Sequence, residues 1–230
     1  MSPSAHNAHR LRRTPQGAEN YAKAIYELET REDGAVGTGA IAERLGVTPA
    51  SASTMLKRLA EEGLVEYTPY HGVRLTERGE QIALEVIRHH RLLELFLAEV
   101  LEVPWDRVHE EAEVLEHHIS TELANSIARK LGHPTRDPHG DPIPDAKLRV
   151  SEAETVRLAS LDRGQRGTFV RVSDSDPAML RYLSERGIAP GDRFEVTGRQ
   201  PFEGPLTVRF GGAEQTLGGR LAEAMRVEVD

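Results

Sequence analysis

The sequence predicts a mainly α-helical protein that ends in a β domain. Apolar residues recur at helical spacing through most of residues 17–130, and two short β-prone runs near residues 64–76 interrupt them. From about residue 151 the chain changes to β-forming runs separated by glycines. With 38% hydrophobic and 29% charged residues, the composition is that of an ordinary soluble globular protein. A length of 230 residues is enough for one large domain or two to three small ones.

The N-terminal residues 1–15 are polar and basic and contain no apolar core. We therefore expect a short disordered tail rather than a secretory signal. No apolar run approaches 18 residues, which argues against a membrane-spanning helix. The chain has no cysteine, and the lack of a disulfide framework fits a cytoplasmic location.

Two short helices joined by a tight turn are predicted after an initial helix over residues 17–30. The first of the two, over residues 38–47, is amphipathic, and Gly46 is the residue type that commonly follows a helix end. Thr48 is suited to cap the second helix, and Pro49 is suited to its first position.

A β-hairpin is predicted directly after the second helix. Residues 64–67 and 73–76 are β-prone, and residues 69–72 between them supply the turn. Two helices joined by a glycine turn and followed by a hairpin are typical of the winged helix-turn-helix, a DNA-binding unit. The alternative is a small three-helix protein-interaction module.

The second helix of this unit exposes small, hydroxyl and basic side chains. Small side chains let a helix lie close to base edges, while its cations reach phosphates. The predicted DNA-binding residues are Thr48, Ala50, Ser51, Thr54, Lys57 and Arg58.

Residues 81–130 predict long helices with strong apolar faces. Pro104-Trp105 breaks the pattern, and a second long helix is expected over about residues 106–131. Helices this apolar cannot cover themselves alone, so a dimer interface is expected along them. Residues 137–145 are rich in proline and glycine and predict an irregular linker.

Four β-forming runs and one helix are predicted in the C-terminal region. The runs are residues 168–172, 193–196, 206–210 and 225–229, and the helix covers residues 177–186. A small barrel of about five strands is the natural closure for such runs.

Histidine and carboxylate residues are concentrated on the helices of the middle region. They are His90 and Glu94, spaced i, i+4, and His109, Glu113, Glu116 and His117, which share one face if their segment is read as a single helix. Mixed imidazole and carboxylate ligands suit a divalent first-row metal, and the absence of cysteine argues against a thiolate zinc site. The alternative is that these side chains lie on exposed helix surfaces and bind no metal.

The charge distribution supports a cation site in the middle region. The net charge of −8 at first speaks against nucleic-acid binding. Residues 81–145, however, contain 6 Lys and Arg against 13 Asp and Glu, together with 7 of the 10 histidines. Residues 1–80 contain 10 basic and 11 acidic residues, so this region is nearly neutral and can still present a basic face.

Three other functions fit the sequence less well than a metal-dependent regulator does. A hydrolytic metal enzyme would leave the DNA-binding pattern unexplained, and the sequence has no nucleophile motif, Gly-rich phosphate loop or His-Glu-x-x-His run. A metal-storage protein would not need a winged helix. A winged-helix regulator that responds to a small organic ligand is the main alternative, but it leaves the concentrated ligand residues unexplained.

A winged helix, a helical metal-binding segment and a small β-barrel, in this order, resemble the diphtheria toxin repressor family of metal-dependent transcriptional regulators. The resemblance covers essentially the whole chain after the first 15 residues. Its most specific motifs are Ala22-x-x-Ile25-Tyr26-Glu27-Leu28, His89-His90-Arg91-Leu92-Leu93-Glu94, Val108-His109-Glu110-Glu111-Ala112-Glu113-x-x-Glu116-His117 and Asp137-Pro138-x-Gly140-x-Pro142-Ile143-Pro144. The run Glu113-x-x-Glu116-His117-His118 is similar to the manganese transport regulator branch.

This resemblance implies a three-domain member of the family. Residues 16–80 would form the DNA-binding domain, residues 81–150 the dimerisation and metal-binding domain with its linker, and residues 151–230 an SH3-like (FeoA-like) barrel. It also implies a homodimer that binds double-stranded operator DNA when loaded with Mn²⁺ or Fe²⁺, and no membrane partner.

The resemblance further implies two metal sites. The primary site would comprise Asn20, Glu113, Glu116 and His117. The ancillary site would comprise His90, Glu94 and His109, completed from the barrel by Asp174 and Asp176. Iron-responsive members have cysteine at the position of Glu113, and a harder carboxylate there favours manganese.

Two residues depart from the manganese branch. Its members usually have Asp at the position of Asn20, and its two-domain members have Glu at the position of Lys23. An amide oxygen can still bind a metal, but a protonated lysine cannot. We therefore expect two separated mononuclear sites rather than a tightly paired dinuclear site.

Overall fold

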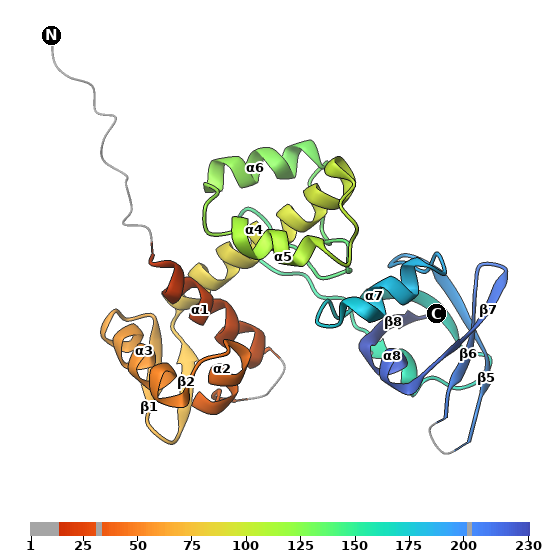
Figure 1. The fold of residues 1–230 in the computed structure, drawn as a ribbon, viewed down its shortest axis with the longest axis horizontal. Helices are drawn as coiled ribbons and strands as arrows, with labels where there is room; N and C mark the ends of the chain where they lie inside the picture. Colours follow the sequence, from red (N-terminus) through yellow and green to blue (C-terminus); the bar gives the residue numbers. More distant parts are fainter. Residues whose placement is uncertain (1–13, 31–33, 202–203) are drawn as a thin grey trace, which may run out of the picture. The chain divides into compact units, whose positions relative to one another are not determined.

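The computed structural model describes residues 14–30, 34–201 and 204–230 (Figure 1). The chain divides into two compact units, of which the first ends at Val86 and the second begins at Ile87. The predicted N-terminal tail lies outside the described residues except for its last two positions. No helix in the described part of the chain is long and apolar enough to cross a membrane.

Three helices and a two-stranded hairpin form the first unit, followed by the start of a long helix. The elements are α1 (Gln16–Glu29), α2 (Thr38–Arg44), α3 (Pro49–Glu61), β1 (Val65–Thr68) and β2 (Gly72–Leu75). The two strands are antiparallel, and Ile25, Ile41 and Leu56 from the three helices share a fully buried core with Val73 of the hairpin. The predicted winged helix-turn-helix is confirmed.

Local sequence signals explain the turn between α2 and α3. Gly46 has φ +64°, a conformation that a residue without Cβ adopts at little cost. The Thr48 hydroxyl accepts a hydrogen bond from the Ser51 backbone N–H at 3.2 Å, and Pro49 occupies the first helical position. These caps fix the start of α3 and therefore the direction in which its exposed face points within the unit.

Helices α4 (Glu77–Leu101), α5 (Val108–Leu115) and α6 (Thr121–Lys130) provide the helical part of the second unit. Their apolar residues pack together around Leu92, Ala112 and Ala124, all fully buried, and Ile143 of the linker joins this core. The long helix before Pro104 is confirmed.

The predicted single helix over residues 106–131 is wrong, because the chain makes two helices with a turn between them. The His118 N–H bonds to the Leu115 carbonyl, which tightens the end of α5 into a turn. Ser120 then adopts an extended conformation and its hydroxyl caps α6 by accepting from the Leu123 N–H at 3.1 Å. Glu116 and His117 therefore lie beyond the end of α5 and not on a continuous helical face.

A six-stranded antiparallel sheet in the order β3-β8-β4-β5-β6-β7 forms the described C-terminal part of the second unit. The strands are β3 (Val156–Arg157), β4 (Arg166–Val172), β5 (Arg193–Arg199), β6 (Leu206–Phe210), β7 (Ala213–Leu217) and β8 (Met225–Val229), with α7 (Pro177–Ser184), α8 (Gly219–Ala224) and the 3-10 turn η1 (Leu158–Ser160). Register shifts bend β4 and β5, which fits a sheet that curves into a small barrel.

The four β-runs and the helix predicted from the sequence are confirmed, but three regular elements were missed. Strand β7 was missed because most of its residues are exposed and only Leu217 is fully buried, so it carries no hydrophobic alternation. Strand β3 has two residues, and α8 has six, both too short for a periodicity argument.

The predicted irregular linker is confirmed, and it packs closely on the barrel. The Val172 N–H of β4 bonds to the His139 carbonyl at 3.0 Å. Gly140 has φ +91°, and a Cβ at this position would lie 1.9 Å from the Val170 carbonyl oxygen. Only glycine therefore allows the linker backbone to approach β4 this closely.

We predict that Gly140→Ala destabilises the protein more than Gly132→Ala, as measured by urea unfolding. Both positions have positive φ, but a Cβ at Gly132 meets no atom within 4 Å. The Gly132 variant should cost about 1 kcal/mol from backbone strain alone. The Gly140 variant should cost an additional 1–3 kcal/mol, roughly, for displacing the linker. Equal losses in the two variants would show that the linker does not depend on this close approach.

Candidate functional site

Helix α4 buries several polar side chains in the second unit, and His90 and Glu94 are among them. His90 and Glu94 lie one helical turn apart and are only 5% and 1% exposed. A buried carboxylate is costly unless it is paired with charge or coordinates a metal. The groups that surround Glu94 therefore define the candidate site.

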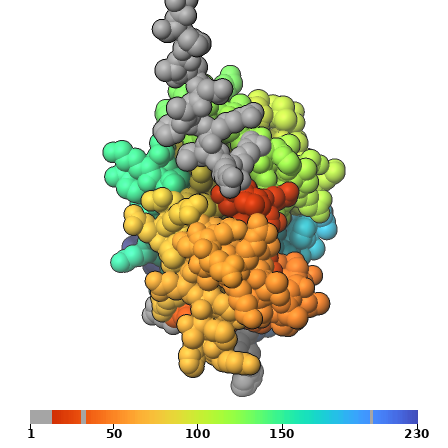
Figure 2. Space-filling model, turned by 90° about the vertical axis from the view of Figure 1, so that its left-hand side faces the viewer, coloured from red at the N-terminus to blue at the C-terminus, as the bar shows by residue number. Residues whose placement is uncertain are grey.

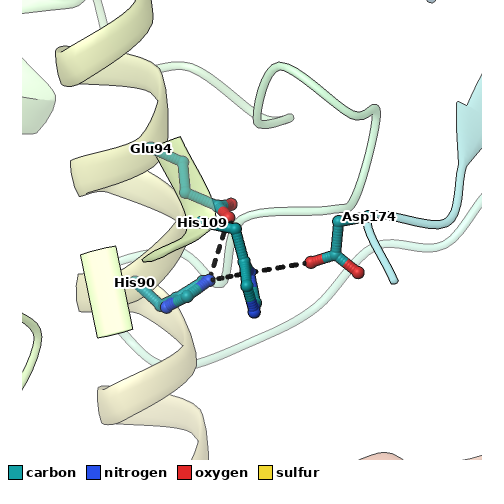
Figure 3. A group of neighbouring side chains, drawn as sticks. All are labelled: His90, Glu94, His109 and Asp174. Carbon is teal, nitrogen blue, oxygen red and sulfur yellow. Dashed lines mark hydrogen bonds and ion pairs between the residues drawn. The ribbon is translucent and has the colours of Figure 1, made fainter. Parts of the chain in front are cut away.

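Side chains from two helices and from the barrel meet at Glu94 (Figure 3). His90 Nε2 lies 2.9 Å and His109 Nδ1 3.2 Å from Glu94 Oε1, and His109 Nδ1 lies 3.0 Å from Asp174 Oδ2. One ligand atom from each of the four residues lies within 4.8 Å of those of the others. Two imidazoles and two carboxylates at this spacing suit a single divalent cation.

A hydrogen bond orients the His90 ring for this site. His90 Nδ1 lies 2.5 Å from Glu116 Oε2, so in the neutral form that binds a metal we assign the ring proton to Nδ1, which donates to this carboxylate. The lone pair is then on Nε2, which faces Glu94 and lies 3.1 Å from His109 Nδ1. A carboxylate that fixes the tautomer of a ligating histidine is a common arrangement around bound metals.

Protonated imidazoles supply the positive charge that compensates the carboxylates of this cluster. The hydrogen bonds to Asp174 and Glu94 raise the pKa of His109 to about 10 although burial opposes its charge. Burial works against ionised Asp174, but the hydrogen bond and charge of His109 lower the Asp174 pKa to about 2. Burial likewise opposes ionised Glu94, yet the charge of His90 and the hydrogen bonds of the surrounding imidazoles hold its pKa well below its usual value.

A second cluster extends from the same carboxylate to the linker, where Asp137 and His139 join Glu94. His139 Nε2 lies 2.8 Å from the Trp105 carbonyl oxygen and donates to it, and the two rings stack with centroids 5.8 Å apart. The other nitrogen, Nδ1, lies 3.8 Å from Glu94 Oε2. The ring thus turns its second nitrogen toward the buried carboxylate, as a metal ligand would.

Asp137 and His139 were missed among the site residues predicted from the sequence. Asp137 Oδ1 accepts from the backbone N–H groups of His139 and Asp141 at 2.9 Å, which fixes the linker turn. Burial, with Asp141 and Glu94 nearby, raises the Asp137 pKa well above its usual value. The signal was present in the motif Asp137-Pro138-x-Gly140, but its proline and glycine content indicated only a linker.

A third cluster contains His90, Glu113 and Glu116. Glu116 is 1% exposed and its Oε1 lies 3.2 Å from His117 Nε2, so His117 contacts this cluster through Glu116. Glu113 is half-exposed and its Oε1 lies 3.9 Å from His109 Nε2. Most of the residues predicted for the primary site therefore gather next to those predicted for the ancillary site, with His90 between them.

Two other predicted ligands are not among the residues of these three clusters. Asn20 belongs to α1 in the first unit, and its Oδ1 is buried without a hydrogen-bond partner in the described part of the chain. Asp176 caps α7: its Oδ1 accepts from the Ala178 N–H at 3.0 Å, and its Oδ2 lies 3.2 Å from Arg220. Asp176 is in none of the three clusters found among the described residues, because helix capping and an arginine already use its oxygens.

The predicted DNA-binding residues share the exposed face of α3, which Figure 2 shows in orange. Thr48, Ala50, Ser51, Thr54, Lys57 and Arg58 are all exposed. Ala52, Leu56 and Leu59, on the opposite side of the helix, are fully buried. Arg58 forms an exposed ion pair with Glu62 at 2.9 Å, an interaction that is weak enough in water for a phosphate to replace.

Three protein families match successive parts of the chain. Residues 14–73 match the iron-dependent repressor N-terminal DNA-binding domain, and residues 76–145 match the iron-dependent repressor metal-binding and dimerisation domain. Residues 156–229 match the FeoA domain. The iron-dependent repressor IdeR of Mycobacterium tuberculosis is 33% identical to this chain, over 91% of this chain and 96% of the relative. The chain belongs to the diphtheria toxin repressor family.

Other family members support this assignment along the whole length of the chain. The diphtheria toxin repressor of Corynebacterium efficiens is 32% identical and matches 91% of this chain and 94% of the relative. A solved structure described as a manganese-dependent transcriptional repressor in complex with manganese is 42% identical, with a TM-score of 0.85 over 93% of this chain and all of that one. The structure of the manganese regulator SloR is 30% identical, with a TM-score of 0.72 over 93% and 98% of the two chains.

We predict that metal binding to this family member releases protons and strengthens as pH rises. The pKa of His109 is about 10, so its ring is protonated near neutral pH and must lose that proton to bind a metal. Each released proton adds about a tenfold gain in apparent affinity per pH unit below the pKa. Titration of Mn²⁺ between pH 6 and 8 should give a smaller slope for His109→Gln than for the wild type. His71→Gln, at an exposed histidine in the hairpin turn, is the control, and equal slopes in all three proteins would exclude proton displacement at His109.

Proposed function

We propose that this chain is a transcriptional regulator that binds operator DNA as a homodimer loaded with Mn²⁺ or Fe²⁺. The observation that carries the proposal is the convergence of imidazole and carboxylate donors on the buried Glu94, in a chain that also exposes a polar winged-helix recognition surface. The relatives include iron-dependent and manganese-dependent repressors, which agrees with this function.

The donor chemistry favours manganese. The ligand atoms that meet at Glu94 are carboxylate oxygens and imidazole nitrogens, and the chain contains no cysteine. Carboxylate oxygens suit Mn²⁺, imidazole nitrogens also suit iron, and thiolates would select softer ions. His90, Glu94, His109 and Asp174 would hold one ion, and Asp137 and His139 would offer further donors on the opposite oxygen of Glu94. Glu113, Glu116 and His117 would form the primary site, with Asn20 contributing its amide oxygen.

The dimer would use the apolar surface of the helical region. Leu101 at the end of α4, Val114 and Leu115 of α5, and Leu123 of α6 are all exposed. A group of exposed large apolar side chains on neighbouring elements is typical of a protein interface. A two-fold symmetric dimer would cover these side chains and present two recognition helices to one operator.

The proposed division of labour follows three regions. Residues 16–80 bind DNA, residues 81–150 dimerise and bind metal, and residues 151–230 complete the metal centre through Asp174. In this proposal the protein switches between two binding states and is not an enzyme, and its DNA target places it in the cytoplasm.

The first test is a mobility-shift titration of operator DNA with added Mn²⁺ and with a chelator. DNA affinity should depend on the metal, and Glu94→Gln should raise the Mn²⁺ concentration required at least tenfold, because the central carboxylate loses its charge. Glu99→Gln, at an exposed glutamate on the same helix, should respond like the wild type. Equal DNA binding with metal and with chelator would contradict the proposal.

A second test addresses Asn20, whose buried Oδ1 lacks a partner among the described residues. If this oxygen binds the metal, Asn20→Asp should tighten Mn²⁺ binding, since the new carboxylate compensates more of the cation's charge. Gln16→Glu adds the same charge at an exposed position of α1 and should leave the affinity unchanged. Calorimetric titration that gives one affinity for all three proteins would remove α1 from the site.

Metal and operator should also strengthen each other's binding by the same factor. This reciprocity is required if both select one conformation of the dimer, and couplings of about 1–3 kcal/mol are typical. Manganese affinity measured with and without operator DNA, at one salt concentration, provides the factor for comparison with the metal's effect on DNA affinity. A manganese affinity that DNA leaves unchanged would mean that the two binding events are independent.

A further inference from the structure

A row of three arginines crosses the outer face of the barrel. Arg226 of β8 pairs across the sheet with Arg157 of β3 on one side and with Arg171 of β4 on the other. Met225 and Val227, the strand neighbours of Arg226, are fully buried, so strand alternation places Arg226 on the outer face. Like charges directly opposite one another in a sheet are destabilising. Anionic groups next to these arginines would reduce this repulsion.

The two outer arginines have such partners, and the central one does not. Arg157 lies 3.0 Å from Glu223, and Arg171 lies 3.1 Å from Asp141. Arg226 forms no ion pair with a carboxylate in the described part of the chain, and its Nε is buried without a hydrogen-bond partner there. A buried donor without an acceptor costs free energy that a bound anion would recover.

A cavity of about 110 Å³ lies beside Arg226. The linker contributes Pro142, and Arg136 comes from just before it. Strand β4 contributes Arg171, and the segment before β3 contributes Glu152 and Thr155. A water molecule needs about 10–15 Å³ of such volume, so the cavity has room for a ligand of several non-hydrogen atoms. Arg171 is paired with Asp141, so Arg136 and Arg226 against the single carboxylate of Glu152 leave the lining with a net positive charge.

We propose that this cavity binds a small oxyanion of the phosphate or carboxylate type. Arg226 would supply its buried Nε–H, and Arg136, which otherwise donates to the Gly140 carbonyl at 2.5 Å, would supply a second guanidinium. Guanidinium forks match the oxygens of phosphate and carboxylate, whereas a metal ion would be repelled. The Thr155 hydroxyl offers an additional donor.

This site is separate from the metal clusters, since none of its lining residues belongs to them. Its walls nevertheless come from both the linker and the barrel. Arg136 directly precedes the linker residue Asp137, which joins Glu94 in the second cluster. A bound oxyanion would therefore brace the linker against β4 next to the metal centre.

The test uses the full chain without metal, at constant ionic strength maintained with chloride. Inorganic phosphate and acetate are titrated separately, and the side-chain Nε–H signals of arginine and the melting temperature are recorded. One of the two anions should shift the Arg226 signal saturably and raise Tm by roughly 2–4 °C. Saturation by phosphate or by acetate identifies which oxyanion type the site takes, and a shift that does not saturate with either anion overturns the proposal.

Two variants and a control separate this site from general charge effects. Arg226→Met should raise Tm in chloride alone, because the like-charge row is broken, and should lose the response to the anion. Arg136→Met should weaken anion binding at least tenfold. If the Arg226 variant does not fold, the Arg136 variant alone tests the proposal. Arg163→Met, at an exposed arginine on the same barrel, should respond as the wild type does. A wild-type response in both cavity variants would contradict the proposal.

Discussion

The structure of the second unit depends on one buried negative charge, the carboxylate of Glu94. At 1% exposure this group cannot be solvated by bulk water, so the protein must surround it with positive charge. The imidazoles of His90, His109 and His139 approach it from helix α4, helix α5 and the linker. The folds of these three segments, and the packing of the linker on the barrel, can therefore be understood as the means of enclosing a site for a cation.

The fold could be predicted largely because local signals and hydrophobic periodicity agree in this chain. Thr48 and Pro49 mark the start of the recognition helix, and the fully buried Leu56 lies on the face opposite the exposed one. The helix over residues 106–131 was wrong for a definite reason: apolar residues keep helical spacing through a turn that Ser120 caps. A side-chain cap inside a periodic pattern can end one helix and start another, and periodicity alone does not reveal it.

The sequence could indicate which candidate site residues lie together where they share a helix, but not where tertiary structure brings them together. His90 and Glu94 are one turn apart on α4, so spacing alone places them together. Asp174 came from the resemblance, because no local pattern relates the segment after β4 to a helix more than 60 residues earlier. His139 was not selected, since its approach to Glu94 depends on the linker turn around Asp137.

The stacking of Trp105 on His139 gives the molecule an internal optical reporter. Trp105 is the only tryptophan in the chain, and its backbone carbonyl accepts the hydrogen bond that orients the His139 ring. Indole emission is sensitive to the charge of a stacked imidazole. The fluorescence of the unlabelled protein should therefore follow changes in charge at the linker side of Glu94, without the introduction of a dye.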